Sequence, residues 1–218
     1  MDLCLGKPNR NIKIGDLQID NTFTIGHFTT LLFQEQPKFR DCFKVTLLRE
    51  PVDRSISAYF FHGHKAREID YCLQNPLQSR RCRYHWQYSN DMTRQLAGSR
   101  DRKWNTYFEH PINVPPPNRT HLESAKMKLM TDFDLVCFTD DLPSCATGVL
   151  DAFHLNRNEA NANLTEGLSH MTATVKDEFY VTKTRPKQLD NTTMTKFIKA
   201  NELDLELYNW AVDHFRTA

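Results

Sequence analysis

The stretch TLLREPVDRSISAYFF, residues 46–61, joins the end of an apolar run to the start of a helical pattern. The run begins earlier, and FKVTLL at 43–48 predicts a strand buried on both faces, as in a parallel sheet. Pro51 suits the first turn of a helix, where its missing N–H is not needed. We therefore predict a helix from about residue 51 to 65 directly after this strand.

Strands and helices alternate along the rest of the chain. We predict further strands at 22–26 and 134–139, loops at 70–84 and 110–118, and helices at 85–98, 120–131, 142–153, 190–200 and 203–215. This alternation indicates an α/β fold with a mainly parallel sheet. The 218 residues show no clear boundary, so a single domain over 1–218 is predicted.

Composition excludes some broad classes of function. The net charge is +1, so a general nucleic-acid footprint is not expected. No run of about 18 apolar residues exists, so no membrane span is expected. The first 20 residues lack the apolar core of a signal peptide.

Six cysteines and three glycosylation triplets bear on the compartment. No CxxC pair occurs, and the HGH at 62–64 has no carboxylate or cysteine to complete a site, so no metal is predicted. Cys72 and Cys82 flank a polar loop and are predicted to bridge. The triplets begin at Asn118, Asn163 and Asn191, and alone they show nothing because such triplets often arise by chance. Together with the cysteines they favour a secretory lumen.

Arg49 and Ser57 are the candidate ligand-binding residues of the opening stretch. Ligands of open α/β folds bind outside the carboxyl ends of the strands, where Arg49 is predicted to lie. Its planar guanidinium suits phosphate oxygens, and the N-terminus of the following helix attracts anions. Ser57 comes eight positions after Arg49 and shares a helix face with Asp53. The alternative is that Arg49 is a surface charge and Ser57 a small packing residue.

The segment LLREPVDRSISAYF resembles the 3′-phosphate-binding segment of sulfotransferases that use 3′-phosphoadenosine 5′-phosphosulfate (PAPS). In that family a strand ends in Arg-Asp/Glu-Pro, followed by x-x-Arg-x-x-Ser-x-Tyr. The matching residues here are Arg49, Glu50, Pro51, Arg54, Ser57 and Tyr59. The resemblance implies that Arg49 and Ser57 hold the 3′-phosphate. It leaves Arg54 as either a support for this loop or an exposed helix arginine.

Other segments resemble the Golgi branch that sulfates sugars, most closely the uronyl and heparan sulfate 2-O-sulfotransferase type. TIGHFTTLLF carries a Gly26-His27 step like that of the proposed catalytic histidine of this group, 22 positions before Arg49. The segments YSNDMTRQLAG, FDLVCFTDDLPSCATGVL and NELDLELYNWAVDHF resemble further elements of these enzymes. In the last, Asp204, Leu207, Tyr208, Ala211 and Phe215 recur at helical spacing.

The resemblance implies a P-loop-kinase-like three-layer sandwich and transfer of a sulfuryl group from PAPS to a glycan hydroxyl. His27 is then the general base, a role that suits histidine near neutral pH; the alternative is a histidine packed at the end of a strand. Lys183 and Arg185 in TKTRPKQL match a basic loop that closes over the nucleotide, or else form a solvated loop. The basic segments at 79–86 and 99–103 either line a cleft for an acidic glycan or form a charged solvent face.

The N-terminal segment departs from the family pattern. These enzymes carry an upstream strand, loop and helix that grip the 5′-phosphosulfate, but CLGKPNRN is a poor version of that loop, and no apolar strand is predicted before Lys7. We therefore expect the chain to lack this first strand-loop-helix. We also expect a membrane anchor that is absent from this chain, with the full-length form a type II protein of the Golgi lumen.

Two functions stay open from the sequence. One is a PAPS-dependent carbohydrate sulfotransferase. The alternative is a non-catalytic or truncated relative that binds a nucleotide or a glycan. A phosphoryl-transfer kinase is less favoured, because the sequence holds no GxxxxGK[ST].

Overall fold

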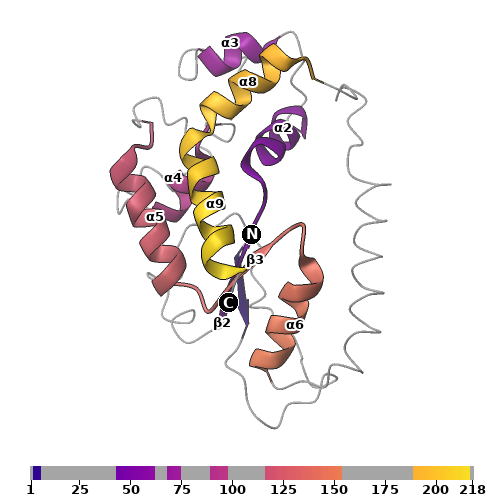
Figure 1. Ribbon diagram of the computed structural model, residues 1–218, viewed down its shortest axis with the longest axis vertical. Helices are drawn as coiled ribbons and strands as arrows, with labels where there is room; N and C mark the ends of the chain where they lie inside the picture. The colour runs from indigo at the N-terminus through magenta and orange to yellow at the C-terminus, as the bar shows by residue number, and fades with distance from the viewer. Residues whose placement is uncertain are drawn as a thin grey trace. The chain divides into compact units, whose positions relative to one another are not determined.

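The computed structural model describes residues 2–5, 43–61, 68–74, 89–97, 116–153 and 189–216. The described residues divide into two compact units, one with residues 2–5, 43–48 and 132–153 and the other with residues 49–61, 68–74, 89–97, 116–131 and 189–216. We call the first the strand unit, which holds the three strands and helix α6, and the second the helical unit, which holds the other helices. The structure is therefore mixed α/β and mostly helical (Figure 1). The single domain predicted over residues 1–218 stays a prediction.

The sheet of the strand unit has the order β1-β2-β3. Strand β2 (Phe43–Leu48) pairs in parallel with β3 (Leu135–Phe138), with Val45 opposite Leu135 and Leu48 opposite Phe138. Val45 and Leu48 are buried, as are Val136 to Phe138. The two strands predicted at 43–48 and 134–139 are confirmed. Both are apolar runs with buried residues, as expected for strands of a parallel sheet.

Strand β1 (Asp2–Leu5) was not predicted, and the expectation of no strand before Lys7 is wrong. β1 pairs antiparallel with β2, and the register places Leu5 opposite Phe43. The carboxyl end of β1 therefore lies at the edge where β2 begins, not where β2 and β3 end. A strand of four residues carries too little periodicity to stand out in the sequence, and its pairing with β2 supplies its hydrogen bonds.

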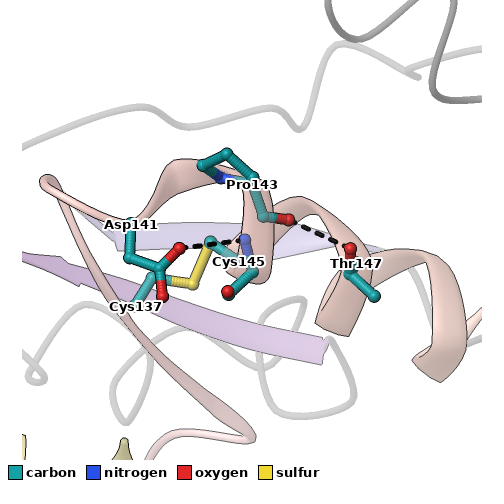
Figure 2. The surroundings of a disulfide bond; sticks show 6 residues. Cys137, Asp141, Pro143, Cys145 and Thr147 are labelled. Carbon is teal, nitrogen blue, oxygen red and sulfur yellow. Dashed lines mark hydrogen bonds between the residues drawn. A yellow bond between two sulfur atoms is a disulfide. The ribbon is translucent and has the colours of Figure 1, made fainter.

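Helix α6 (Leu142–Ala152) follows β3 and is fastened to it by a disulfide between Cys137 and Cys145 (Figure 2). Asp141 caps the helix, accepting a hydrogen bond from the amide of Ser144 at 3.4 Å. A bridge that closes so short a loop stabilises a fold by about 2–3 kcal/mol, mainly by constraining the unfolded chain. The pairing of Cys137 with Cys145 was not predicted from the sequence.

The helical unit contains six helices in the part of the chain that the structure describes: α2 (Pro51–Phe61), α3 (Ile69–Gln74), α4 (Asp91–Ala97), α5 (Arg119–Thr131), α8 (Asn191–Ala200) and α9 (Glu202–Phe215). Figure 1 shows α9 running alongside α5 and directly continuing from α8. None of the described helices is long and apolar enough to cross a membrane.

Two groups of apolar side chains form the core of this unit. The first joins α2, α3 and α8 and consists of Val52, Ile56, Tyr59, Phe60, Ile69, Cys72 and Phe197. The second comes from α4, α5 and α9, where Leu122, Leu129 and Leu207 are fully buried. The helices predicted at 120–131, 190–200 and 203–215 are confirmed as α5, α8 and α9.

Two predicted boundaries are wrong. Residues 70–74, predicted as part of a loop at 70–84, belong to α3, because Ile69 and Cys72 are one turn apart and both enter the core. The helix predicted at 85–98 begins only at Asp91, since Ser89 and Asn90 are not helical and Asn90 has a φ of 47°. Asparagine adopts this left-handed conformation more readily than most residues.

Candidate functional site

Arg49 and Ser57 flank the first two turns of α2, and both are half-buried. Arg49 directly follows the last residue of β2, as predicted. Among the described residues, neither the Arg49 guanidinium nor the Ser57 hydroxyl has a hydrogen-bond or ion-pair partner. A partly buried polar group that has no partner among the described residues is a candidate for contact with a ligand, so we take these two side chains as the candidate site.

The N-terminus of α2 contributes less to this site than the sequence suggests. The Glu50 carboxylate accepts a hydrogen bond from the amide of Asp53 at 2.6 Å. Pro51 has no amide hydrogen to offer. One early donor of the helix is thus occupied and another is absent. A phosphate here would depend mainly on the side chains of Arg49 and Ser57.

Arg54, the second arginine of the motif, is held inside the helical unit. Its Nη2 donates to Oδ2 of Asp91, the first residue of α4. The Asp91 side chain is fully buried, and it also accepts from Nε2 of Gln95 at 2.8 Å. Arg94 lies 3.8 Å from the other carboxylate oxygen. Of the two roles left open for Arg54, the structure favours support of the segment over an exposed charge.

Ser55 is likewise part of the internal structure. It is buried, and its hydroxyl donates to Oδ1 of Asn201 at 3.0 Å. Asn201 also accepts from the amide of Asn90 at 3.2 Å and donates to the carbonyl of Phe197 at 2.8 Å. Because Asn201 stands between α8 and α9, one buried side chain ties α2 to both helices and to the residue before α4.

Helices α4 and α9 cap each other. Oδ1 of Asn90 accepts from the amides of Leu203 and Asp204 at the start of α9, at 2.9 and 3.1 Å. The Asp204 carboxylate accepts from the amides of Met92 and Thr93 at the start of α4, at 2.8 and 2.7 Å. These side chains satisfy donors that the helices cannot satisfy themselves. The reciprocal caps join two of the segments, 88–98 and 201–215, on which the resemblance rests.

No protein-family model matches this chain, and no curated protein matches it.

The resemblance to sulfotransferases therefore depends on the sequence segments described above, above all on Arg49 to Tyr59. Of the five candidate site residues, Arg49 and Ser57 are described, and both lie on one segment of the helical unit. His27, Lys183 and Arg185 lie outside the described residues, so their roles stay predictions. Within the described ranges, no group of three or more histidine, cysteine or acidic residues could hold a metal ion.

The hydrogen bonds between Asp204 and the start of α4 were not predicted from the sequence, although one signal was present. Asp204 recurs with Leu207, Tyr208 and Ala211 at helical spacing, and all four are buried in the structure. A charged residue on an apolar helix face needs a partner when buried. That signal predicts a buried interaction but not its partners, which come from more than 100 positions away.

Burial raises the pKa of Asp204, an effect opposed by the positive charge of Arg54 and by the amides of Thr93 and Met92. The folded chain therefore keeps a proton that the unfolded chain releases above about pH 4. This contribution to stability is complete below that pH and is lost as the pH rises through the folded-state pKa. We expect the free energy of unfolding of the wild type, relative to Asp204→Asn, to fall as the pH rises from about 4.

Urea unfolding of both proteins at several pH values measures this difference. Asp190 and Glu206 have lowered pKa values, which give the opposite pH dependence. They are unchanged in the variant, so their contribution cancels in the comparison. A wild-type advantage that grows with pH would show that the pKa of Asp204 is lowered instead.

Proposed function

We propose that this protein is a PAPS-dependent carbohydrate sulfotransferase, with Arg49 and Ser57 binding the 3′-phosphate of the nucleotide. The observation that carries the proposal is that only some polar side chains of the motif have partners in the described structure. Arg54 and Ser55 are bound by Asp91 and Asn201, whereas Arg49 and Ser57 have no partner among the described residues. The two side chains left available are the two that the resemblance assigns to the phosphate.

The proposed fold is the P-loop-kinase-like three-layer sandwich of these enzymes. The parallel pair β2–β3 and the direct passage from β2 through Arg49 into α2 support it. In such a fold the nucleotide lies outside the carboxyl ends of the strands. The guanidinium of Arg49 and the hydroxyl of Ser57 would supply hydrogen bonds to the oxygens of its 3′-phosphate.

The proposed reaction moves a sulfuryl group from PAPS to a glycan. The sugar oxygen forms a bond to sulfur while the bond between sulfur and the bridging phosphate oxygen breaks. 3′-Phosphoadenosine 5′-phosphate leaves with the bonding electrons. His27 takes the proton of the hydroxyl, which otherwise attacks poorly because its pKa is high. Lys183 and Arg185 are proposed to stabilise the charge that develops on the leaving phosphate.

A secretory compartment fits the described cysteines. Cys137 and Cys145 form a disulfide, and Cys72 is disulfide-bonded as well. Stable disulfides are typical of oxidising compartments. We propose the Golgi lumen, where acidic glycans are acceptors. The predicted partner of Cys72 is Cys82, which lies outside the described residues, so that pairing stays a prediction.

Arg49→Ala tests the nucleotide site. We expect the protein to bind 3′-phosphoadenosine 5′-phosphate, and the substitution to raise its Kd roughly 10- to 150-fold. This range corresponds to about 1.5–3 kcal/mol, as expected for hydrogen bonds to a charged group. Isothermal calorimetry measures both proteins. Ser57→Ala should weaken binding less, because a neutral hydroxyl donates a weaker hydrogen bond than a guanidinium.

The matched control is Lys199→Ala, which removes the same charge from an exposed position on α8. Its Kd should equal that of the wild type at moderate salt. Equal affinity of the wild type and Arg49→Ala would reject the assignment of Arg49. Binding of the nucleotide without sulfation of any glycan would support the non-catalytic alternative.

A further inference from the structure

The segment Asn118-Arg119-Thr120 spans the start of α5, which begins at Arg119, and is exposed at all three positions. Asn118 precedes the helix and caps it, because its Oδ1 accepts from the amide of His121 at 3.2 Å. Neither the Nδ2 of Asn118 nor the Thr120 hydroxyl has a hydrogen-bond partner among the described residues. Arg119, between them, is ion-paired with Glu206 on α9.

We propose that Asn118 carries an N-linked glycan. The co-reactant is a lipid-linked oligosaccharide diphosphate of the secretory pathway. Nδ2 forms a bond to the first carbon of the sugar and loses one proton to water. The bond from that carbon to the diphosphate oxygen breaks, and the diphosphate leaves with the bonding electrons. The amide oxygen is unchanged by this reaction, so it continues to accept from His121. The cap of α5 and the bulky, solvated glycan are therefore compatible in the folded protein.

The second described triplet, Asn191-Thr192-Thr193, differs in its hydroxyl. It lies within the first turn of α8, where the Thr193 hydroxyl donates to Oδ2 of Asp190 at 2.7 Å and its amide donates to Oδ1 at 2.8 Å. Glycosylation requires the hydroxyl residue of the triplet. At Thr193 that group is already part of a helix cap, so the structure assigns the glycan to Asn118 in preference to Asn191.

The experiment expresses the full chain in a mammalian secretory host behind a cleavable leader. Peptides are treated with an amidase that releases N-glycans in heavy-oxygen water, and mass spectrometry locates the labelled aspartates. We expect label at Asn118, with higher occupancy than at Asn191. Thr120→Ala should remove it with the mobility shift of one glycan, and Thr120→Ser should keep it. After the amidase, residue 118 is aspartate where a glycan was attached and asparagine in the Thr120→Ala variant. Either side chain can accept from the amide of His121, so the thermal midpoints of the deglycosylated proteins should stay close to one another.

Unlabelled Asn118 in the secreted wild type would overturn the proposal, as would higher occupancy at Asn191. Label that persists at Asn118 in the Thr120→Ala variant would contradict the role of this triplet. The proposal rests on the lumenal location within the proposed function but not on sulfation. Nucleotide binding is measured separately by calorimetry, so failure of either proposal is distinguishable from failure of the other.

Discussion

Replacing Asp91 with alanine is expected to destabilise the protein by about 3–5 kcal/mol, the range for removing one partner of a buried ion pair. The Asp91 side chain is 0% exposed, and its partners Arg54 and Arg94 are only 19% and 15% exposed. Their guanidiniums stay charged at every accessible pH. Without Asp91, two largely buried cations would lose the carboxylate that lies next to both of them. Urea unfolding measures the loss.

Part of this cost arises from the arginines left behind rather than from the ion pair itself. Adding Arg54→Met to Asp91→Ala should therefore recover some of the lost stability, because it removes one of the unpaired charges and keeps an apolar side chain of similar length. A double-mutant cycle gives the size of this coupling. The effects of Arg54→Met and Asp91→Ala should be clearly non-additive.

Glu202→Ala is the matched control for Asp91→Ala. Both residues are acidic and lie in the first turn of a helix, Glu202 in α9 and Asp91 in α4. They differ in that Glu202 is exposed and Asp91 is buried. Its loss should cost no more than about 1 kcal/mol, the upper range for a surface charge near a helix N-terminus. If Asp91→Ala lowers the free energy of unfolding no more than Glu202→Ala does, the ion pair between Asp91 and Arg54 of α2 does not stabilise the fold as proposed.

Replacing His27 with alanine is expected to slow sulfuryl transfer about 10²- to 10⁴-fold, the usual contribution of a general base. Affinity for 3′-phosphoadenosine 5′-phosphate should be nearly unchanged. The reason is positional, because the sequence predicts that His27 follows a different strand from Arg49 and faces the sulfuryl end of the ligand. Transfer of labelled sulfate to an acidic glycan and calorimetry with the nucleotide measure the two effects.

The wild type and His27→Ala are compared in a form of the protein that sulfates an acceptor. The two proteins differ only at residue 27. His214→Ala, an exposed histidine of α9, is the control and should keep full transfer. Full transfer by His27→Ala would reject the base assignment. Weakened nucleotide binding by His27→Ala would place this residue with Arg49 instead.

Sequence reasoning predicted the strand-to-helix passage well because each signal there is local. FKVTLL is apolar throughout, and Pro51 fixes where α2 begins, so β2 and the start of α2 are confirmed at the predicted residues. Helices α5, α8 and α9 are also confirmed close to the predicted residues. The candidate pair Arg49 and Ser57 could be named for the same reason.

Elements and contacts that depend on residues outside the same helix or strand were predicted poorly. Helix α4 begins at Asp91 because Asp204, more than 100 positions later, accepts its first free amides. β1 exists because it pairs with β2, and the bridge between Cys137 and Cys145 forms because α6 turns back at the end of β3. None of these partners is marked by a local pattern.

The sequence by itself determined the α/β class, most helices and the motif that places Arg49 after a buried strand. Only the tertiary structure decided which polar residues of that motif are structural and which are available. Arg54 and Arg49 carry the same group, but Arg54 meets a buried carboxylate on α4 and Arg49 meets no described partner. The physical reason is that propensity and periodicity act within about one turn or one strand, whereas satisfying a buried charge requires a partner brought close by folding.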